Sequence, residues 1–350
     1  MTNWDRAGAR EAKHEAAARI GELLARHGTA AAPRLGGVPT EPAGPRSVGV
    51  ALGLAPRADG SFALAVRPRL GTPTARMVAR RITDELGAEG VDVRRTGRIR
   101  PLRTATSGMR WPVPQAQATG ETGRVRPLRP GLSIAHVDVT AGTLGAFVTY
   151  DGARHVLSNH HVLVGSSGQP GDAVLQPGPF DGGSDPADRI GALAHLVPLV
   201  AGEEAEVDAA LASLDAPDDV DPAYPGGTLT GTSEVEGGEG VEKIGRTTGV
   251  TRGRVTAIEV DDLLVDYGEG LGTLSFSGQI EVEGEGEESF SDGGDSGSLV
   301  YLRSGMAAVG LLFAGSTTGG SNGQGLTYLN PIDTVLERLG AELEIPEEGT

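Results

Sequence analysis

A serine set among small residues is the clearest chemical feature of this chain. The stretch Gly294-Asp295-Ser296-Gly297-Ser298 lies between an acidic, glycine-rich run (281–288) and an apolar run (299–301). A serine on a tight turn is exposed, and neighbouring backbone N–H groups can point at one spot, which suits an activated nucleophile beside an oxyanion hole. The same residue types also build ordinary turns. The motif therefore needs a base and an acid elsewhere in the chain.

A base and an acid both occur upstream of this serine. The apolar, strand-like segment 156–163 contains a polar corner that ends in His160 and His161, and Asp208 enters the small apolar run 207–212. A carboxylate in such a run needs a hydrogen-bond partner, and a histidine N–H would supply one at a nucleophilic site. The order along the chain is therefore His161, Asp208, Ser296.

These motifs, in this order, resemble the trypsin/chymotrypsin-like serine proteases, and most of all their bacterial and plant intracellular members. The resemblance covers about residues 131–340 and extends through Gly171–Gly178 and Lys243–Gly249. It implies a mainly β fold with two six-stranded β-barrels and a catalytic triad in the cleft between them. The histidine and the aspartate would come from the first barrel and the serine from the second.

The resemblance also assigns roles to individual groups. Ser296 would attack a peptide carbonyl, His161 would act as general base, and Asp208 would orient the imidazole. The backbone N–H groups of Gly294 and Ser296 would form the oxyanion hole. We expect no metal and no organic cofactor, since the scheme needs neither and the chain carries no phosphate-loop or dinucleotide fingerprint.

The paired histidines require a choice. The resembling proteases have a single histidine before the apolar residue, which aligns with His161. Neighbouring residues on a strand point to opposite faces, so we expect His160 to project away from Ser296. Adjacent histidines on a strand cannot easily share one metal ion, and the chain has no cysteine ligands.

Several carboxylates compete with Asp208 for the role of the acid. Asp172 follows Pro170 and Gly171 and is typical of a turn, while three others belong to an acidic loop, namely Asp215, Asp218 and Asp219. Asp208 alone combines a strand context with the expected order.

Asp295 raises the question of activation. In secreted members of the resembling family, this acid pairs with an N-terminus that cleavage has freed. Pro130 disfavours a cut after Arg129, so we expect an internal cation, Lys243 or Arg246, to take that place. The chain would then be competent without processing.

The resemblance places the primary specificity pocket on two segments. One segment, just before the nucleophile, comprises Phe290, Ser291 and Asp292; the other comprises Phe313, Ala314 and Gly315. Phe290 falls where a carboxylate would favour basic substrates, so we expect an apolar or small residue before the cut. Asp292 keeps a basic preference open, and Phe313 reads equally well as a core residue.

Composition and the positions of glycine and proline define the remaining regions. We expect an N-terminal helix (1–28), a linker (29–46), a small α+β module (47–100), a second linker (101–130) and the protease domain (131–345). Within the module, strands are expected at 47–54, 61–66 and 91–95 and a helix at 74–86. The 350 residues contain 55 glycines, 22 prolines and no cysteine. The charged start and the lack of a disulfide framework favour a cytoplasmic protein.

Charge is distributed unevenly along the chain. Residues 67–129 hold 14 Arg/Lys against 5 Asp/Glu, whereas residues 200–290 hold 22 Asp/Glu against 4 Arg/Lys. Three interpretations are open: simple solvation, docking of the basic module on an acidic protease surface within or between subunits, and nucleic-acid binding. The formal net charge of −17 and the lack of interleaved aromatic residues oppose the third.

Two function classes follow from these observations. The first is a serine endopeptidase that cleaves a protein substrate, with the N-terminal region available for a homo-oligomer or a regulatory partner and with no membrane association. The second is a protease-like binding or scaffold protein whose triad is held inactive. Histidine before serine excludes the α/β-hydrolase order. Because a general protease would harm a cytoplasm, we also expect narrow specificity or a gated site.

Overall fold

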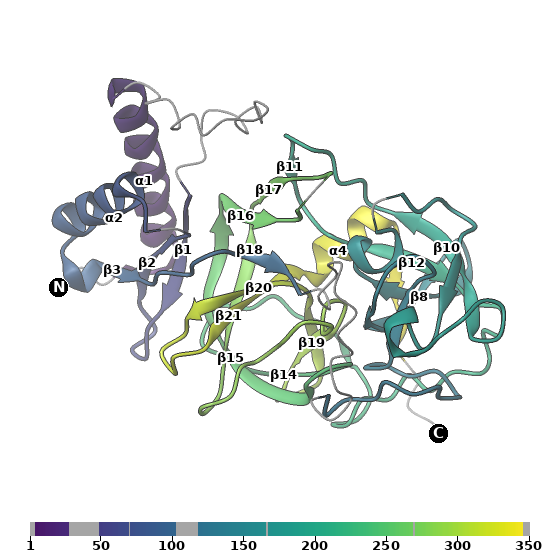
Figure 1. Cartoon of the computed structure of the whole chain (residues 1–350). Helices are drawn as coiled ribbons and strands as arrows, with labels where there is room; N and C mark the ends of the chain where they lie inside the picture. The colour runs from purple at the N-terminus through teal and green to yellow at the C-terminus, as the bar shows by residue number, and fades with distance from the viewer. Residues whose placement is uncertain are drawn as a thin grey trace.

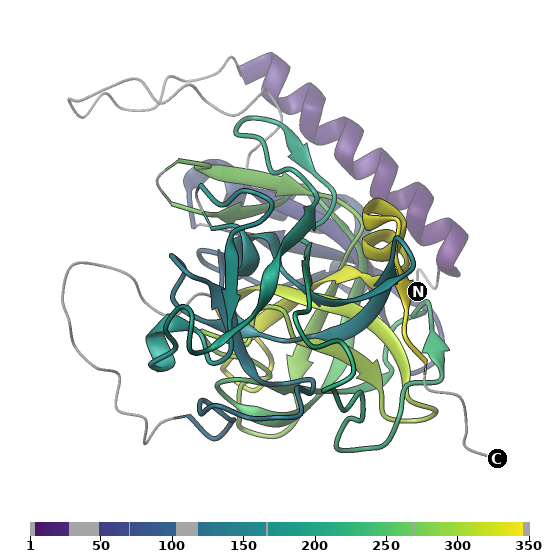
Figure 2. The same cartoon turned by 90° about the vertical axis from the view of Figure 1, so that its right-hand side faces the viewer.

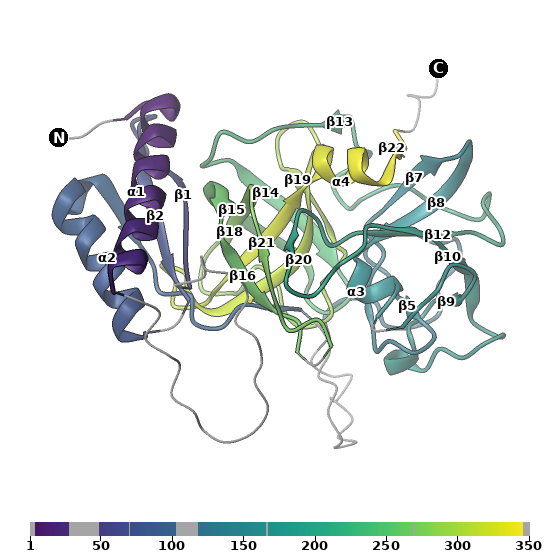
Figure 3. The ribbon, with the colours of Figure 1, turned by 90° about the horizontal axis from the view of Figure 1, so that it is seen from above.

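The computed structural model describes residues 4–27, 49–69, 71–102, 118–165, 167–268 and 270–345. The chain forms two β bodies side by side, and an N-terminal helical layer lies beyond one of them (Figures 1 and 3). The predicted linker 29–46, the last residue of the predicted N-terminal helix (Gly28) and residues 103–117 of the second predicted linker fall outside these residues. No helix in the described ranges is both long and apolar enough to cross a bilayer.

The body nearer the N-terminal layer is a closed six-stranded barrel. Its strands pair in the order β14-β19-β20-β21-β18-β15, and β14 also pairs with β15. Their bounds are β14 (Gly240–Gly245), β15 (Gly249–Asp261), β18 (Gln279–Gly284), β19 (Leu299–Leu302), β20 (Ala307–Gly319) and β21 (Gly325–Pro331). The short β13 (Gly231–Thr232) pairs with β20.

The other body is an eight-stranded curled sheet with the order β22-β7-β8-β12-β10-β9-β5-β6. The bounds are β5 (Ser133–His136), β6 (Gly142–Thr143), β7 (Ala146–Tyr150), β8 (Ala153–Ser158), β9 (Ala173–Leu175), β10 (Arg189–Leu196), β12 (Ala210–Ser213) and β22 (Glu342–Leu343). A small sheet of β11 (Glu204–Ala205), β17 (Thr273–Phe276) and β16 (Leu263–Asp266) lies apart from it. This is the expected mainly β, chymotrypsin-like double-barrel architecture.

A shared apolar cluster joins the two bodies. Leu157 and Ala146 from the curled sheet pack with Leu299 and Leu311 from the closed barrel. Helix α4 (Ile332–Leu339) completes the cluster with its buried face, which includes Val335. The relative position of the barrels is therefore fixed by a continuous core rather than by a loop.

The N-terminal module extends the closed barrel rather than folding apart from it. Strand β1 (Val50–Pro56) pairs with β15, β2 (Phe62–Pro68) pairs with β1, and β3 (Val91–Val93) pairs in parallel with β2. Helix α2 (Pro73–Leu86) begins where Thr72 Oγ1 accepts the N–H of Ala75, with Pro73 in the first turn. A single turn of 3₁₀ helix (Ala88–Gly90) precedes β3.

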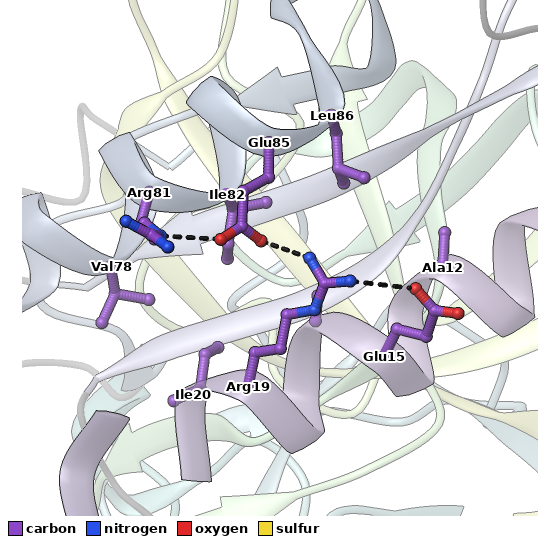
Figure 4. Close-up of a pocket in the computed structure, with 10 residues that line it drawn as sticks. Ala12, Glu15, Arg19, Ile20, Val78, Arg81, Ile82, Glu85 and Leu86 are labelled. Carbon is purple, nitrogen blue, oxygen red and sulfur yellow. Dashed lines mark hydrogen bonds and ion pairs between the residues drawn. The ribbon is translucent and has the colours of Figure 1, made fainter. Parts of the chain in front are cut away.

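Helix α1 (Arg6–His27) packs on the module of its own chain. Its buried face of Ala9, Ala12, Ala16 and Ile20 lies on the β1–β2 surface. Figure 4 shows the groove between α1 and α2, bridged by Arg19 and Glu85. The helix lies along the outside of the molecule (Figure 2), and most of its charged side chains are exposed.

The basic module does dock on acidic side chains of the barrel within the chain. Arg67 is fully buried, with its Nε 2.7 Å from Glu281 Oε2 and its Nη2 2.8 Å from Glu281 Oε1. Arg94, directly after β3, pairs with Glu283 of β18. On the helix, Arg6, Arg10 and Lys13 all pair with Glu259. Of the three interpretations of the uneven charge, intramolecular docking therefore has direct support.

We predict that Arg67→Met lowers the free energy of unfolding by about 3–5 kcal/mol, because it leaves the Glu281 carboxylate buried and unpaired. The matched control is Arg81→Met, whose side chain is 63% exposed and whose loss should cost less than about 1 kcal/mol. Urea unfolding of the two variants measures both values. Equal values for the two variants would show that the Arg67–Glu281 pair does not hold the module.

Candidate active site

The carboxylate of Asp208 is the centre of a buried hydrogen-bond network. Asp208 lies just before β12 and is 0% exposed. The Nδ1 of His161 is 2.5 Å from its Oδ2, and the backbone N–H of His161 donates to its Oδ1 at 3.1 Å. The phenol of Tyr267 donates to the same Oδ2 at 2.5 Å. One carboxylate thus fixes the ring and the backbone of His161 together.

Side-chain amides hold the backbone of Asp208 from both barrels. Asn330, in β21, accepts its N–H at 2.9 Å, and Asn159 donates to its carbonyl at 2.7 Å. Gln279 in turn accepts from the Asn330 amide at 2.6 Å. The position of Asp208 therefore depends on the packing of one barrel against the other.

The network also keeps Asp208 ionised. Burial alone would raise the pKa of its carboxyl group, but attraction to His161 and the hydrogen bonds from His161 and Tyr267 outweigh burial. The result is a pKa lowered to about 2. A negative charge on Asp208 is what holds an imidazole in the tautomer that carries a proton on Nδ1.

The histidine pair does not lie on a strand, which corrects our expectation. Strand β8 ends at Ser158, and His160–Leu163 form a single helical turn, α3. The strand argument for the direction of His160 therefore does not apply. The ring that contacts Asp208 is nevertheless that of His161, and both histidines are buried.

The turn that carries Ser296 is held against the eight-stranded curled sheet by close contacts. Thr143 donates its N–H to the Ser296 carbonyl at 2.8 Å, and Ser158 Oγ donates to the Thr143 carbonyl at 2.8 Å. Gly297 has φ +94°, and a Cβ there would lie 2.2 Å from Ser158 Oγ. Only glycine fits, because the backbone is left-handed and the space is filled. The turn is thus fixed beside the end of β8, three residues before His161.

A row of aromatic rings links His161 to the strand that accepts the serine hydroxyl. The ring of His161 lies 6.2 Å from Tyr267, Tyr267 lies 6.1 Å from Phe276, and Phe276 lies 4.8 Å from Phe313, all between centroids. Ser296 Oγ donates to the Phe313 carbonyl at 3.3 Å. Of the three predicted triad residues, His161 and Asp208 are in direct contact, and the turn that carries Ser296 lies against Thr143 and Ser158, at the end of the strand that leads to His161.

Ser296 is 0% exposed, which corrects the expectation of an exposed nucleophile. Gly294, which has φ +106°, donates its N–H to the carbonyl of Leu102 at 2.6 Å. This N–H is the first of the two predicted oxyanion donors, and it already faces a carbonyl oxygen. The start of the second predicted linker (101–130) therefore reaches the turn that carries Ser296.

Asp295 is buried beneath the turn and is neutralised internally. Lys243 Nζ lies 3.3 Å from its Oδ2, and Thr248 Oγ1 donates to the same oxygen at 2.7 Å. The N–H groups of Thr247 and Asp292 donate to the carboxylate at 2.9 Å each. Burial would raise the pKa of Asp295, but Lys243 and these donors lower it.

Of the two cations considered for Asp295, Lys243 takes the place beside it. Burial lowers the pKa of Lys243, and its pairing with Asp295 opposes that shift. Arg246 instead forms a two-pronged pair with Asp181 in the other barrel. The turn therefore takes its present form without a freed N-terminus.

The predicted pocket residues divide into core and rim. Phe290 and Phe313 are 1% and 0% exposed and belong to apolar clusters. Ser291 Oγ lies 2.7 Å from Thr327 Oγ1, and Asp292 Oδ1 accepts the N–H of Gly293. Ala314 and Gly315 lie on β20. Asp292 is thus engaged in the local turn.

Two residues that contact Asp208 escaped the sequence analysis. Tyr267 and Asn330 both hold Asp208, yet they lie 59 and 122 residues further along the chain. Neither is part of a motif, and only the fold brings them to the site. Among the rival carboxylates, Asp172 Oδ2 lies 3.1 Å from His136 Nε2. No group of three or more His, Asp or Glu side chains poised for a metal occurs in the described part of the chain.

Comparison with known proteins yields matches among solved structures. No protein-family model matches the chain, and no curated protein matches it. Three similar solved structures are Thermobifida fusca protease A (22% identity, TM-score 0.44, 63% of this chain and 100% of that chain), the Nocardiopsis protease NAPase (20%, 0.44, 62% and 100%) and Cellulomonas bogoriensis chymotrypsin (21%, 0.42, 63% and 100%). The fold of this chain is defined by its own strand order, described above, and not by these similarities.

We predict that stability falls as the pH drops from about 4 to 2. The ordinary pKa of the Asp208 carboxyl is 3.8 and the folded value is about 2. Between these values the unfolded chain binds the proton more tightly, so about 2 kcal/mol present above pH 4 is lost as the pH falls through the folded pKa. Urea unfolding of Ser296→Ala across this range measures the loss.

Tyr267→Phe provides the sharper form of the same experiment. Removing the phenol raises the folded pKa of Asp208, so the loss of stability begins at a higher pH. Tyr150→Phe is the matched control, because the Tyr150 ring packs on His155 and His195 away from Asp208. The same pH profile for both tyrosine variants would contradict the assigned role of Tyr267.

Proposed function

We propose that the chain is a serine endopeptidase that acts through Ser296, His161 and Asp208. The observation that carries the proposal is the 2.5 Å contact between His161 Nδ1 and the buried Asp208 carboxylate, supported by the Tyr267 phenol. A buried charge costs free energy unless it is paired and hydrogen-bonded, and His161 and Tyr267 supply those partners. A base held in one tautomer beside a serine turn is suited to nucleophilic catalysis.

The proposed reaction begins when Ser296 Oγ attacks a peptide carbonyl. The Nε2 of His161 takes the hydroxyl proton and later gives it to the leaving amine, while Asp208 stabilises the imidazolium. The N–H groups of Gly294 and Ser296 receive the developing oxyanion, and each such donor is worth about 2.7–4 kcal/mol. Water then releases the acyl group and restores the serine.

The proposal includes a protein substrate and a cytoplasmic setting, as the sequence suggested. An oligomer or a regulatory partner would dock through the exposed face of α1, because the opposite face is occupied by the module. Nucleic acid is disfavoured, since several of the basic side chains that could bind it are paired with carboxylates of the same chain.

A latent, protease-like scaffold is the alternative, and two observations favour it. Ser296 Oγ donates to the Phe313 carbonyl, and the Gly294 N–H is already engaged by Leu102. Both groups would have to change partner before an external substrate could react. The two functions differ in whether the serine is chemically activated.

Labelling with a fluorescent fluorophosphonate tests this difference. We predict that the wild-type chain is labelled, that Ser296→Ala and His161→Ala are not, and that Asp208→Asn is labelled about 10⁴-fold more slowly because its imidazole loses the correct tautomer. Ser298→Ala is the matched control, since Ser298 is equally buried in the same motif but its Oγ donates to the Asp295 carbonyl. Labelling that persists in Ser296→Ala would remove the assignment of the nucleophile.

A further inference from the structure

The short strand β4 (Arg100–Pro101) leads directly to the turn that carries Ser296. It pairs antiparallel with β20, with Pro101 opposite Ala314 and Arg100 opposite Gly315. In Figure 1 the blue chain after β3 runs from the N-terminal layer across to the middle of the molecule. Addition of one extended strand to a sheet is a common way in which proteins bind peptides. The chain therefore presents a stretch of itself in the manner of a bound peptide.

The next residue, Leu102, contacts the turn that carries Ser296. Its carbonyl oxygen accepts the Gly294 N–H at 2.6 Å, close to the range of about 2.7–3.1 Å for an oxyanion donor. Its side chain packs against the apolar cluster that contains Phe290. A Cβ on Gly315 would lie 2.9 Å from Leu102 Cδ2, so the glycine leaves room for the leucine.

The register of the strand agrees with this position. Pro101, the middle residue of the segment, is buried. Because proline has no backbone N–H, this position donates no hydrogen bond to β20. Arg100 is mostly exposed, with its side chain near Asp266. Leu102 thus places an apolar side chain against the apolar cluster, Pro101 precedes it, and the guanidinium of Arg100 stays at the surface.

We propose that Arg100-Pro101-Leu102 is the enzyme's own substrate and that the chain cleaves itself on the carboxyl side of Leu102. This inference rests on the proposed endopeptidase function and names its preferred substrate, an apolar residue preceded by proline. It also accounts for the burial of Ser296, because the substrate segment covers the nucleophile before the cut.

The reaction balances as a hydrolysis. Ser296 Oγ bonds to the carbonyl carbon of Leu102, the peptide C–N bond breaks, and His161 transfers the serine proton to the amine released at position 103. One water molecule then cleaves the ester, leaving a carboxylate on Leu102 and a free hydroxyl on Ser296. The products are residues 1–102 and 103–350.

Intact-mass analysis of the freshly purified full chain over time tests the proposal. We expect the wild type and Leu102→Met to convert to the two fragments at a rate independent of protein concentration. Ser296→Ala should stay whole, and Leu102→Asp should convert at least about 100-fold more slowly, because the apolar pocket rejects a carboxylate. The pairing of β1 with β15 should keep the fragments together in size-exclusion chromatography.

Fluorophosphonate labelling of the same samples separates the two possible failures. If the wild type stays whole but the wild type or Leu102→Asp is labelled, self-cleavage is overturned. The proposed endopeptidase function then still stands. Absence of labelling in every variant would remove the endopeptidase and the inference with it. A cut at another position, or a rate that rises with concentration, would overturn the assignment of Leu102 as an intramolecular substrate.

Discussion

The buried carboxylate of Asp208 is the constraint on which the site depends. A charge removed from water in this way is tolerated only when donors surround it, and here the donors come from both sides of the cleft. His161 approaches from the first barrel, whereas Tyr267 and Asn330 come from the second half of the chain. Satisfying this ion therefore ties the two barrels together at the site, in addition to the apolar core that they share.

The same logic recurs beneath the nucleophile and at the N-terminal module. Asp295 is neutralised by Lys243 and by loop N–H groups, so the turn is held without a freed terminus. Glu281, fully buried in β18, is neutralised by Arg67 from β2. Each pair ties a separate stretch of chain to the closed barrel. The module is thereby positioned so that the segment after β3 can reach across the cleft.

Motifs and order along the chain were enough to predict the double barrel and the residues of the proposed triad. Local patterns also predicted α2 and the three module strands to within a few residues, because Thr72 and Pro73 mark the start of the helix and short, mainly apolar runs mark β1 and β2. The sequence could not show that β1 would join β15, since pairing between distant strands leaves no local signal. Tyr267 and Asn330 escaped for the same reason, and the helical turn at His160 was mistaken for strand because four apolar-flanked residues fit either form.

The most direct measurement of the central claim is the proton NMR spectrum of the Ser296→Ala chain at low field, where strongly hydrogen-bonded imidazole protons appear. We expect a resonance from the His161 Nδ1 proton, held by the Asp208 carboxylate, that disappears when Asp208→Asn is added. A spectrum with no such resonance, or one unchanged by Asp208→Asn, would mean that the carboxylate does not hold the imidazole. The network would then be structural, and the proposed mechanism would fail.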